Sequence, residues 1–261
     1  MAIKIMNEIK QAVLKFGGSV LSSQRDFPRI ADEIKSFTDD GYQVFAVVSA
    51  YFGVTENLIS QARKNNIETN SLEYAQLIAS GEFESARDLS DYLIEDSIQA
   101  SWKSPSELSF IAKGNRNSAS PISIDSEKIA QALQDTPVVV MPGFSAIDQD
   151  QNCVLLGRGG SDISAVCVAQ ALKLNEVRLL KDVDGLYDKD PNKHSNAKRL
   201  PFVDYNTARK IGGELIQTEA INFAASKQIC IDIATIGNQF ASRIGPKQDT
   251  TEAVLAIGAV Q

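Results

Sequence analysis

Short apolar runs alternate with amphipathic segments along most of the chain. Residues 12–16 (AVLKF) form one apolar run, and residues 42–50 (YQVFAVVSA) form another that is rich in β-branched and aromatic side chains. Residues 26–41, which lie between them, have helical periodicity. The apolar face of that segment consists of Ile30, Ile34 and Phe37. This order predicts two buried parallel strands joined by a crossover helix.

The alternation continues toward the C-terminus. Residues 56–104 are mostly helical in pattern, with a polar break at 65–70. Beyond them the pattern predicts a strand end and helix over 122–135, a strand and loop over 136–147, a helix over 161–172, a strand and loop over 176–187, two short helices over 203–228, and strands over 229–237 and 252–258. Together these elements predict a three-layer α/β/α sandwich around a central, mainly parallel sheet.

Composition places the chain among ordinary globular proteins. It has 261 residues, of which 43% are hydrophobic and 23% charged. This length fits a single domain over residues 1–261 that buries its own core without disulfides or structural metal. The net charge of −7 argues against non-specific binding of nucleic acids or anionic membranes, although one local basic pocket can still bind an anion.

Cysteine usage and the N-terminal segment favour a cytoplasmic protein. The three cysteines, Cys153, Cys167 and Cys230, are far apart and show no CxxC spacing, which is typical of reduced thiols. The first sixteen residues lack the apolar core of a signal peptide. No apolar stretch approaches the roughly 20 residues that a membrane-spanning helix needs.

Three glycine-containing stretches carry the candidate chemistry. The first, KFGGS (15–19), follows the first predicted strand, so Lys15 stands at a strand end, where open parallel sheets bind ligands. Gly17 and Gly18 allow positive φ and let an anion approach the backbone amides. A plain turn with a solvated lysine is an equally good interpretation of this stretch alone.

The second stretch, LLGRGGSDISAV (155–166), precedes a predicted helix. Ser161 or Asp162 can serve as its N-cap, and a helix N-terminus preceded by glycines is suited to binding an anion. Arg158 adds a planar donor for a carboxylate or phosphate. Asp162 would repel a bound phosphate unless it caps the helix or holds a cation such as Lys15 or Mg²⁺. Together these residues favour anion binding over a purely structural turn.

The third stretch, KDVDGLYDKDP (181–191), contains four aspartates around one glycine and one tyrosine. It does not fit the calcium loop of an EF-hand, and Asp-Gly and Asp-Pro also mark ordinary turns. The chain contains neither a GxxxxGK[ST] nor a GxGxxG motif, so it is neither a P-loop enzyme nor a plain dinucleotide-binding protein by motif. His194, the single histidine, lies in a polar loop, which argues against a Ser–His–Asp mechanism.

Taken together, these stretches resemble the amino-acid kinase superfamily and, within it, aspartokinase. KFGGSV (15–20) is similar to the aspartokinase opening KFGGTSV, and VVSAYFGVTENL (47–58) is similar to its VVSAMGGVTD-type segment. The further matches, in the same order along the chain, are SGE (80–82), GFSA (143–146), GRGGSD (157–162) and DVDGxYxxDP (182–191). The resemblance covers residues 12 to about 235.

The resemblance implies an ATP-dependent kinase that phosphorylates a side-chain carboxylate, most directly aspartate to 4-phospho-aspartate. Lys15 and Asp162 are the implied catalytic residues: Lys15 steadies the transferred phosphoryl group, and Asp162 orients Lys15. The implied amino-acid-binding residues are Ser49, Thr55, Glu82 and Arg158. The implied phosphate and ATP contacts are Gly17, Gly18, Ser19, Gly160, Ser161, Lys181, Asp182, Tyr187 and Asp190. Mg²⁺ accompanies ATP and is held by phosphates and water, so the metal is assigned no protein ligand.

The resemblance also implies how the chain is divided. The acceptor binds a lobe of about residues 1–172, the nucleotide binds a lobe of about residues 173–261, and two copies form a homodimer. Within the implied site, the resemblance pairs Arg158 with the substrate's α-carboxylate and Glu82 with its α-ammonium. From the residues alone, Glu82 and Thr55 could instead be helix-capping residues, and Tyr187 could be a packing residue.

The chain departs from the aspartokinase pattern in several places. Glu214 stands where the family has a lysine, Asn192 where it has an arginine, and Lys181 where it has a threonine. Residues 83–142 form a shorter segment than the corresponding part of aspartokinases. Only residues 238–261 follow the strand predicted over 229–237, so we expect no feedback control through C-terminal regulatory domains. The changed charges predict altered nucleotide use or a different acid substrate.

Two other functions stay open from the sequence. One is a superfamily kinase acting on a different small acid or on a phosphate group, although Arg158 with Glu82 suits a zwitterionic amino acid better. The other is a degenerate nucleotide- or metabolite-binding protein, which Glu214 and Asn192 favour. The presence of Lys15, Arg158 and Asp162 argues against that second alternative.

Overall fold

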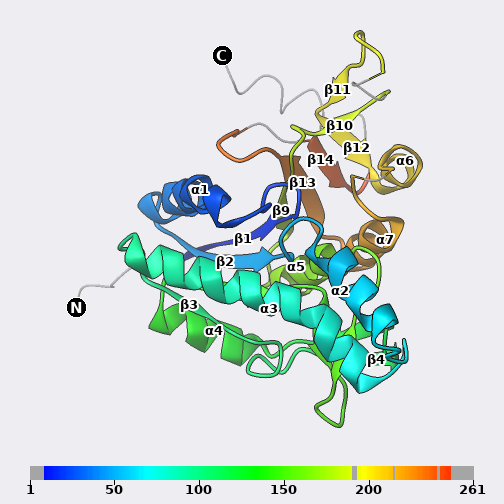
Figure 1. The fold of residues 1–261 in the computed structure, drawn as a ribbon. Coiled ribbons are helices and arrows are strands. Elements are labelled where there is room, and N and C mark those ends of the chain that lie inside the picture. Colours follow the sequence, from blue (N-terminus) through cyan, green and yellow to red (C-terminus); the bar gives the residue numbers. More distant parts are fainter. Residues whose placement is uncertain (1–8, 190–192, 214, 240–241, 248–261) are drawn as a thin grey trace, which may run out of the picture.

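A mainly parallel sheet forms the centre of the molecule (Figure 1). The computed structural model describes residues 9–189, 193–213, 215–239 and 242–247. Within these residues, eight strands pair from edge to edge in the order β12 (Phe202–Asp204), β14 (Ser242–Gly245), β13 (Cys230–Ala234), β9 (Glu176–Leu180), β1 (Lys10–Phe16), β2 (Tyr42–Val48), β6 (Val138–Pro142) and β3 (Ala100–Trp102). β13 and β14 run antiparallel, and the other described neighbours run parallel.

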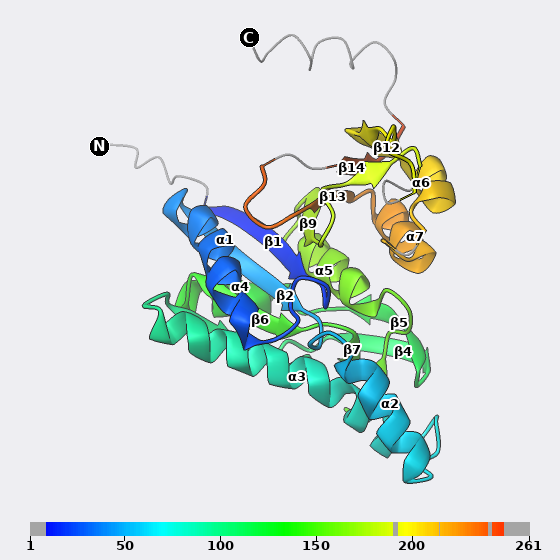
Figure 2. The ribbon, with the colours of Figure 1, turned by 45° about the horizontal axis from the view of Figure 1, so that its top comes forward.

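Helices cover both faces of this sheet (Figures 1 and 2). One face packs against α1 (Phe27–Asp39) and α3 (Leu72–Glu95). The other face packs against α4 (Ser126–Asp135), α5 (Gly160–Ala171) and α7 (Thr218–Lys227). The remaining described helices are the 3₁₀ turn η1 (Gln24–Asp26), α2 (Val54–Lys64), which packs on α3, and α6 (Tyr205–Ile211), which lies beside α7.

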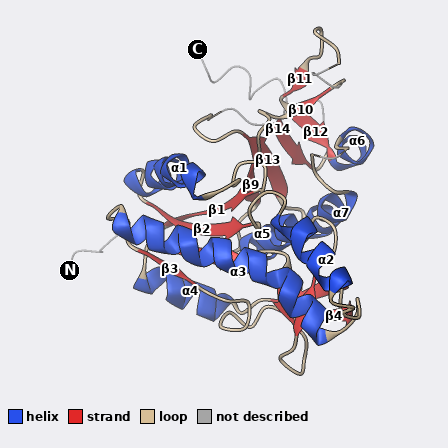
Figure 3. Ribbon diagram, in the orientation of Figure 1, coloured by secondary structure: helices blue, strands red, loops and turns tan. Residues whose placement is uncertain are grey.

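The two faces separate because strand side chains alternate. In β2, Val44 and Ala46 pack on the α1 and α3 side, whereas Phe45 and Val47 pack on the α4 and α5 side. The strand is buried on both faces, which explains its nearly continuous apolar sequence. The predicted three-layer α/β/α sandwich with a mainly parallel sheet is therefore confirmed (Figure 3).

Two smaller sheets were not predicted. One consists of β5 (Ser118–Ser123), β4 (Ile111–Asn115), β7 (Ser145–Ile147) and β8 (Cys153–Leu155). The other is the hairpin of β10 (Leu186–Tyr187) and β11 (Arg199–Leu200). Their strands are short, and β4 and β5 are largely exposed and polar, so no apolar run marks them. β3 lies in the segment 56–104 that was predicted as mostly helical, so the prediction is wrong at these three residues, and the short β14 was not predicted.

The longer predicted elements agree well with the structure. The helix predicted over 161–172 is α5, Gly160–Ala171, and the two short helices predicted over 203–228 are α6 and α7. The strand predicted over 252–258 lies outside the described residues. The eight-stranded sheet contains strands from both sides of the predicted boundary at residue 172, so the two predicted lobes share one sheet.

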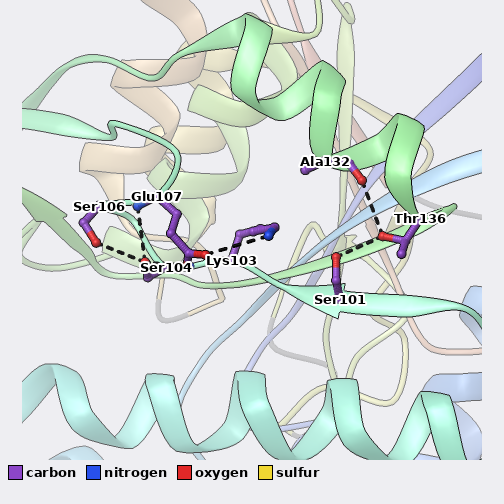
Figure 4. A network of polar contacts seen from close by, with 7 residues as sticks. All are labelled: Ser101, Lys103, Ser104, Ser106, Glu107, Ala132 and Thr136. Carbon is purple, nitrogen blue, oxygen red and sulfur yellow. Dashed lines mark hydrogen bonds and ion pairs between the residues drawn. The ribbon is translucent and has the colours of Figure 1, made fainter.

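Polar side chains fasten the edge strand β3 to the end of α4 (Figure 4). The hydroxyls of Ser101 and Thr136 lie 2.9 Å apart, and Thr136 also donates to the carbonyl of Ala132, 3.4 Å away. Just beyond β3, Ser104 donates to the Glu107 carboxylate at 2.7 Å. These contacts give the polar side chains beside edge strand β3 hydrogen-bond partners within the protein.

Replacing Phe45 tests this description of the core. Phe45 is fully buried in β2, so Phe45→Ala should lower the free energy of unfolding by about 3–5 kcal/mol. Ile94→Ala is the matched control, because Ile94 is 55% exposed on α3 and should change stability by less than about 0.5 kcal/mol. Urea unfolding of both variants measures the difference, and equal losses would contradict the assigned core.

Candidate active site

The candidate site lies where β1, β9 and α5 meet. β1 and β9 are parallel neighbours, with Lys15 opposite Leu179 and Phe16 opposite Leu180, so their carboxyl ends reach the same edge of the sheet. Lys15 is the penultimate residue of β1, and Lys181 directly follows β9. The first turn of α5 brings Asp162 to both lysines. Ligands of open parallel sheets bind at this edge.

Asp162 holds two ammonium groups. Its Oδ1 lies 2.7 Å from Lys15 Nζ, and its Oδ2 lies 3.2 Å from Lys181 Nζ. The side chains of all three residues are buried, with 6%, 6% and 11% exposed for Lys15, Asp162 and Lys181. Burial raises the pKa of Asp162, but the two lysines outweigh burial and lower this pKa to about 2. Asp162 is therefore a carboxylate at every physiological pH.

Glu82 is the second buried acid of the site. It lies inside α3, so the alternative that it caps a helix is wrong. Its Oε1 accepts a hydrogen bond of 2.9 Å from Ser161 Oγ, and its Oε2 has no hydrogen-bond partner among the described residues. Burial raises the pKa of Glu82 to about 8, despite the hydrogen bond from Ser161 and the charge of Lys15. An unsatisfied buried oxygen of this kind is ready to accept a bond from a ligand.

The N-terminus of α5 supplies donors beside these acids. The N-cap is Gly159, with φ of 70°, and it follows Gly157, with φ of 74°. The prediction that Ser161 or Asp162 caps the helix is therefore wrong, since both lie in the first turn. Helix geometry leaves the backbone N–H groups of Ser161 and Asp162 without an intrahelical acceptor. Free amides of a first turn, together with the helix dipole, favour an anion at this position.

The positive φ predicted for Gly17 and Gly18 is wrong. Neither has positive φ, so left-handed backbone is not the reason for glycine there. A Cβ on Gly18 would come within 3.3 Å of the Ala50 carbonyl oxygen, so the absence of a side chain gives the loop room. The amide of Gly17 donates to Leu180 O at 3.3 Å, and that of Gly160 donates to Gly157 O at 3.0 Å. In this structure, both of these predicted phosphate donors bind backbone carbonyls.

A cavity of about 750 Å³ opens onto this cluster. The predicted site residues that line it are Lys15, Gly18, Ser49, Thr55, Glu82, Arg158, Gly160, Ser161 and Asp162. Arg158 is exposed on the loop before α5, where its guanidinium is accessible to a ligand. Thr55 is the second residue of α2, whose N-cap is Gly53, so the alternative that Thr55 caps this helix is wrong.

The predicted nucleotide contacts divide between two places. Ser19, Lys181 and Asp182 line a second cavity, of about 740 Å³, between α1 and the loop after β13. Tyr187, on β10, donates its hydroxyl to Asp184 Oδ1 at 2.7 Å. Asp190 lies outside the described residues, as do Asn192 and Glu214, so their predicted roles stay predictions.

Phe144 and Phe52 are two of the aromatic residues that line the cavity, and neither was predicted as a site residue. Phe144 follows β6 with φ of 61°, and a Cβ on Gly160 would come within 2.7 Å of its ring, so the glycine lets the two segments approach. Phe52, which is 73% exposed, lines the cavity from the loop after β2. The only sequence signal for either residue is its place in a motif, GFSA or SAYFG. A single aromatic residue forms no periodic pattern that could mark it.

The described part of the chain contains neither a metal-binding cluster nor a membrane-spanning helix. There, no group of three or more His, Cys, Asp or Glu residues is placed to hold a metal ion. Both carboxylates deep in the cavity, Asp162 and Glu82, already accept bonds from protein groups. Among the same residues, no helix combines the length and the apolar character needed to cross a bilayer.

Several curated proteins with similarity to this chain are named aspartate kinase or aspartokinase. An aspartate kinase of Pseudomonas fluorescens is 32% identical over 222 residues, which cover 83% of this chain and 54% of that protein. Aspartate kinase Ask_LysC of Stutzerimonas stutzeri is 30% identical over 220 residues, which cover 83% and 53%. The chain thus spans about half the length of these curated relatives.

Solved structures share the fold. Aspartate kinase from Synechocystis superposes with a TM-score of 0.77 at 25% identity, over 90% of this chain and 40% of that one. E. coli aspartokinase III in complex with aspartate and ADP superposes with a TM-score of 0.74 at 21% identity, over 92% of this chain and 66% of that one. UMP kinase from Bacillus anthracis superposes with a TM-score of 0.64 at 15% identity, over 92% of this chain and 97% of that one.

The family is shown by a family model rather than by any one relative. The description "Amino acid kinase family" matches residues 10–234, which include β1, the buried Lys15–Asp162 pair and the loop after β9. The same segment carries the motifs that suggested this resemblance from sequence. The chain belongs to the amino acid kinase family.

Proposed function

We propose that this chain transfers the γ-phosphoryl group of ATP to the side-chain carboxylate of a small amino acid, with aspartate as the first candidate. One observation carries the proposal: the buried Lys15–Asp162 pair faces a cavity that Glu82 and Arg158 also line. Relatives named aspartate kinase, and a neighbour solved with aspartate and ADP, support the choice of acceptor.

The acceptor fits this cavity by charge. Arg158 offers two parallel N–H groups to an α-carboxylate, and the unpartnered Oε2 of Glu82 accepts from an α-ammonium. Ser49 and Thr55 lie against the remainder of the small substrate. A phosphate acceptor such as UMP has no ammonium group to donate to Oε2 of Glu82, so it fits less well.

The phosphate groups of ATP lie at the sheet edge. Lys15, the free amides of Ser161 and Asp162, and the backbone of Gly18 surround the transferred group. The other contacts assigned to the phosphates and the remainder of ATP are Gly17, Ser19, Gly160, Lys181, Asp182, Tyr187 and Asp190. Magnesium comes with ATP on its phosphates and water, and it supplies charge neutralisation there. The acceptor lobe, nucleotide lobe, homodimer and cytoplasmic location stay predictions.

The reaction needs little covalent help from the protein. A carboxylate oxygen of the acceptor attacks the γ-phosphorus, a new P–O bond forms, and the bond to the β-phosphate oxygen breaks. Its electron pair leaves with ADP, and the product is an acyl phosphate. The side-chain carboxylate of aspartate is ionised at neutral pH, so no general base is required. Lys15 stabilises the charge on the transferring group, and Asp162 fixes the position of Lys15.

A hydroxylamine-trapping assay with MgATP tests the proposal. The acids are aspartate, glutamate and N-acetylglutamate, and ADP release is followed separately with UMP and small phosphates. Aspartyl hydroxamate is the expected product. Hydroxamate from another acid would show that this acid, not aspartate, is the acceptor. UMP-dependent ADP release would show that the acceptor is a phosphate group. Bound ATP without any turnover would favour a binding protein.

Removing the Lys15 charge should abolish turnover. Lys15→Met is expected to lower kcat by roughly 100-fold or more, the scale of losing one group that stabilises transition-state charge. Binding of the acid should change far less, because Lys15 acts on the phosphoryl group. Lys113→Met on the exposed strand β4 is the control. Near-normal kinetics in Lys15→Met would refute the site assignment.

Arg158 should affect acceptor binding more than chemistry. Arg158→Ala is expected to raise the KM for the acid roughly 10- to 100-fold, the scale of a lost charge-assisted bond, with kcat little changed. Arg63→Ala, on the exposed end of α2, should leave both constants unchanged. A fall in kcat at constant KM would place Arg158 on the phosphoryl group instead.

Acid binding should strengthen as pH rises. Burial raises the pKa of Glu82 to about 8, so the free protein holds it neutral below that pH, and only its carboxylate attracts the substrate ammonium. The KM for the acid should be roughly eightfold higher at pH 7 than at pH 8.5. Glu82→Gln should have a high KM that does not vary over this range. The same slope in both proteins would show that another group titrates.

A further inference from the structure

Lys181 adds a charge that the protein alone does not need. Asp162 is already neutralised by Lys15 at 2.7 Å, yet Lys181 Nζ also lies 3.2 Å from the same carboxylate. Two ammonium groups against one carboxylate leave one positive charge in excess. Burying a charge without a counter-charge is costly, so an excess of this kind indicates a missing anion.

Glu82 does not balance this excess. Burial raises its pKa to about 8, which leaves it neutral at pH 7, and its hydrogen bond comes from Ser161. The first turn of α5 increases the excess, because its free N–H groups carry partial positive charge. Burial also lowers the pKa of Lys181, as expected for an ammonium group held without full compensation.

Backbone geometry places the two lysines on either side of Asp162. A Cβ on Gly17 would lie 3.5 Å from Lys15 Nζ and 3.6 Å from Lys181 Cδ, so the Gly17 backbone is close to both side chains. The amide of Lys181 donates to Ala234 O at 2.9 Å, which ties the start of its side chain to β13. Lys15 and Asp162 line the first cavity, whereas Lys181 lines the second, so Lys181 approaches Asp162 from the opposite side.

We propose that Lys181 is a second phosphoryl-binding residue, which with Lys15 clamps the γ-phosphoryl group of ATP, and that Asp162 positions both ammonium groups. This inference rests on the proposed function and specifies the donor side of the same site. The anion that balances the excess charge is the terminal phosphoryl group, which carries more negative charge than one lysine neutralises. Lys181 contacts the substrate in this role and is a catalytic residue.

Paired nucleotide affinities test the proposal without turnover. Isothermal titration measures the dissociation constants of MgADP and of a Mg²⁺-bound, non-hydrolysable ATP analogue. The proteins compared are the wild-type chain, Lys181→Met and Lys181→Arg. Lys181→Met should weaken the analogue about 10- to 100-fold, the scale of a bond to a charged group, and MgADP much less. Lys181→Arg, which keeps the charge, should recover most of the loss. Lys198→Met, on the exposed segment before β11, is the control.

Stability separates this role from a structural one. Lys181→Met without ligand should unfold at the same or higher urea concentration than wild type, because Lys15 still pairs with Asp162 and the excess charge is gone. The proposal would be overturned if Lys181→Met left the ratio of the analogue affinity to the MgADP affinity unchanged. If this variant were also less stable than wild type, the role of Lys181 would be structural. Lys181→Gln is judged by the same ratio if the Met variant does not fold. A wild-type chain that binds neither nucleotide would refute the proposed function as well.

Discussion

A single buried carboxylate, Asp162, organises this molecule. Charged groups lose several kcal/mol of hydration when they are buried, so Lys15, Lys181 and Asp162 are stable only where they meet. This requirement fixes the end of β1, the end of β9 and the first turn of α5 relative to one another. The central sheet supplies the alignment, because parallel neighbours bring their carboxyl ends to one edge. The site is therefore a consequence of the fold rather than an addition to it.

The surrounding residues follow from the same constraint. Gly17 lies against both lysine side chains, and Gly160 lets α5 begin against Phe144. Ser161, beside Asp162, reaches back to Glu82 in α3 and so joins the acceptor side to the phosphate side. One face of this arrangement is rich in donors and positive charge, and the other carries an acid with an unused oxygen. Such an asymmetric cavity suits a reaction between a polyanion and an amino acid.

Elements with a clear period were predictable from sequence, and contacts between distant segments were not. The crossover helix and the strands on either side of it followed from apolar periodicity. The short strands β3 and β4 carried no comparable signal. The motif residues Lys15, Glu82 and Asp162 were predicted as one site, and the structure brings them to one cavity. The N-cap of α5 was predicted wrongly, because side-chain capping was assumed where Gly159 in left-handed backbone suffices. Nor did sequence reveal the charge excess at Lys181, which depends on three-dimensional distance.

The most direct test of the central claim is the origin of the oxygen on the transferred phosphate. The protein would be incubated with MgATP, hydroxylamine and aspartate labelled with ¹⁸O in its carboxylates, and the released phosphate examined by ³¹P NMR. Hydroxylamine attacks the acyl carbon, so phosphate formed by carboxylate attack leaves with one ¹⁸O. We predict the corresponding isotope shift in wild type and its loss in Lys15→Met. Phosphate without ¹⁸O would show that water attacks ATP, and it would contradict the assignment of a carboxylate acceptor.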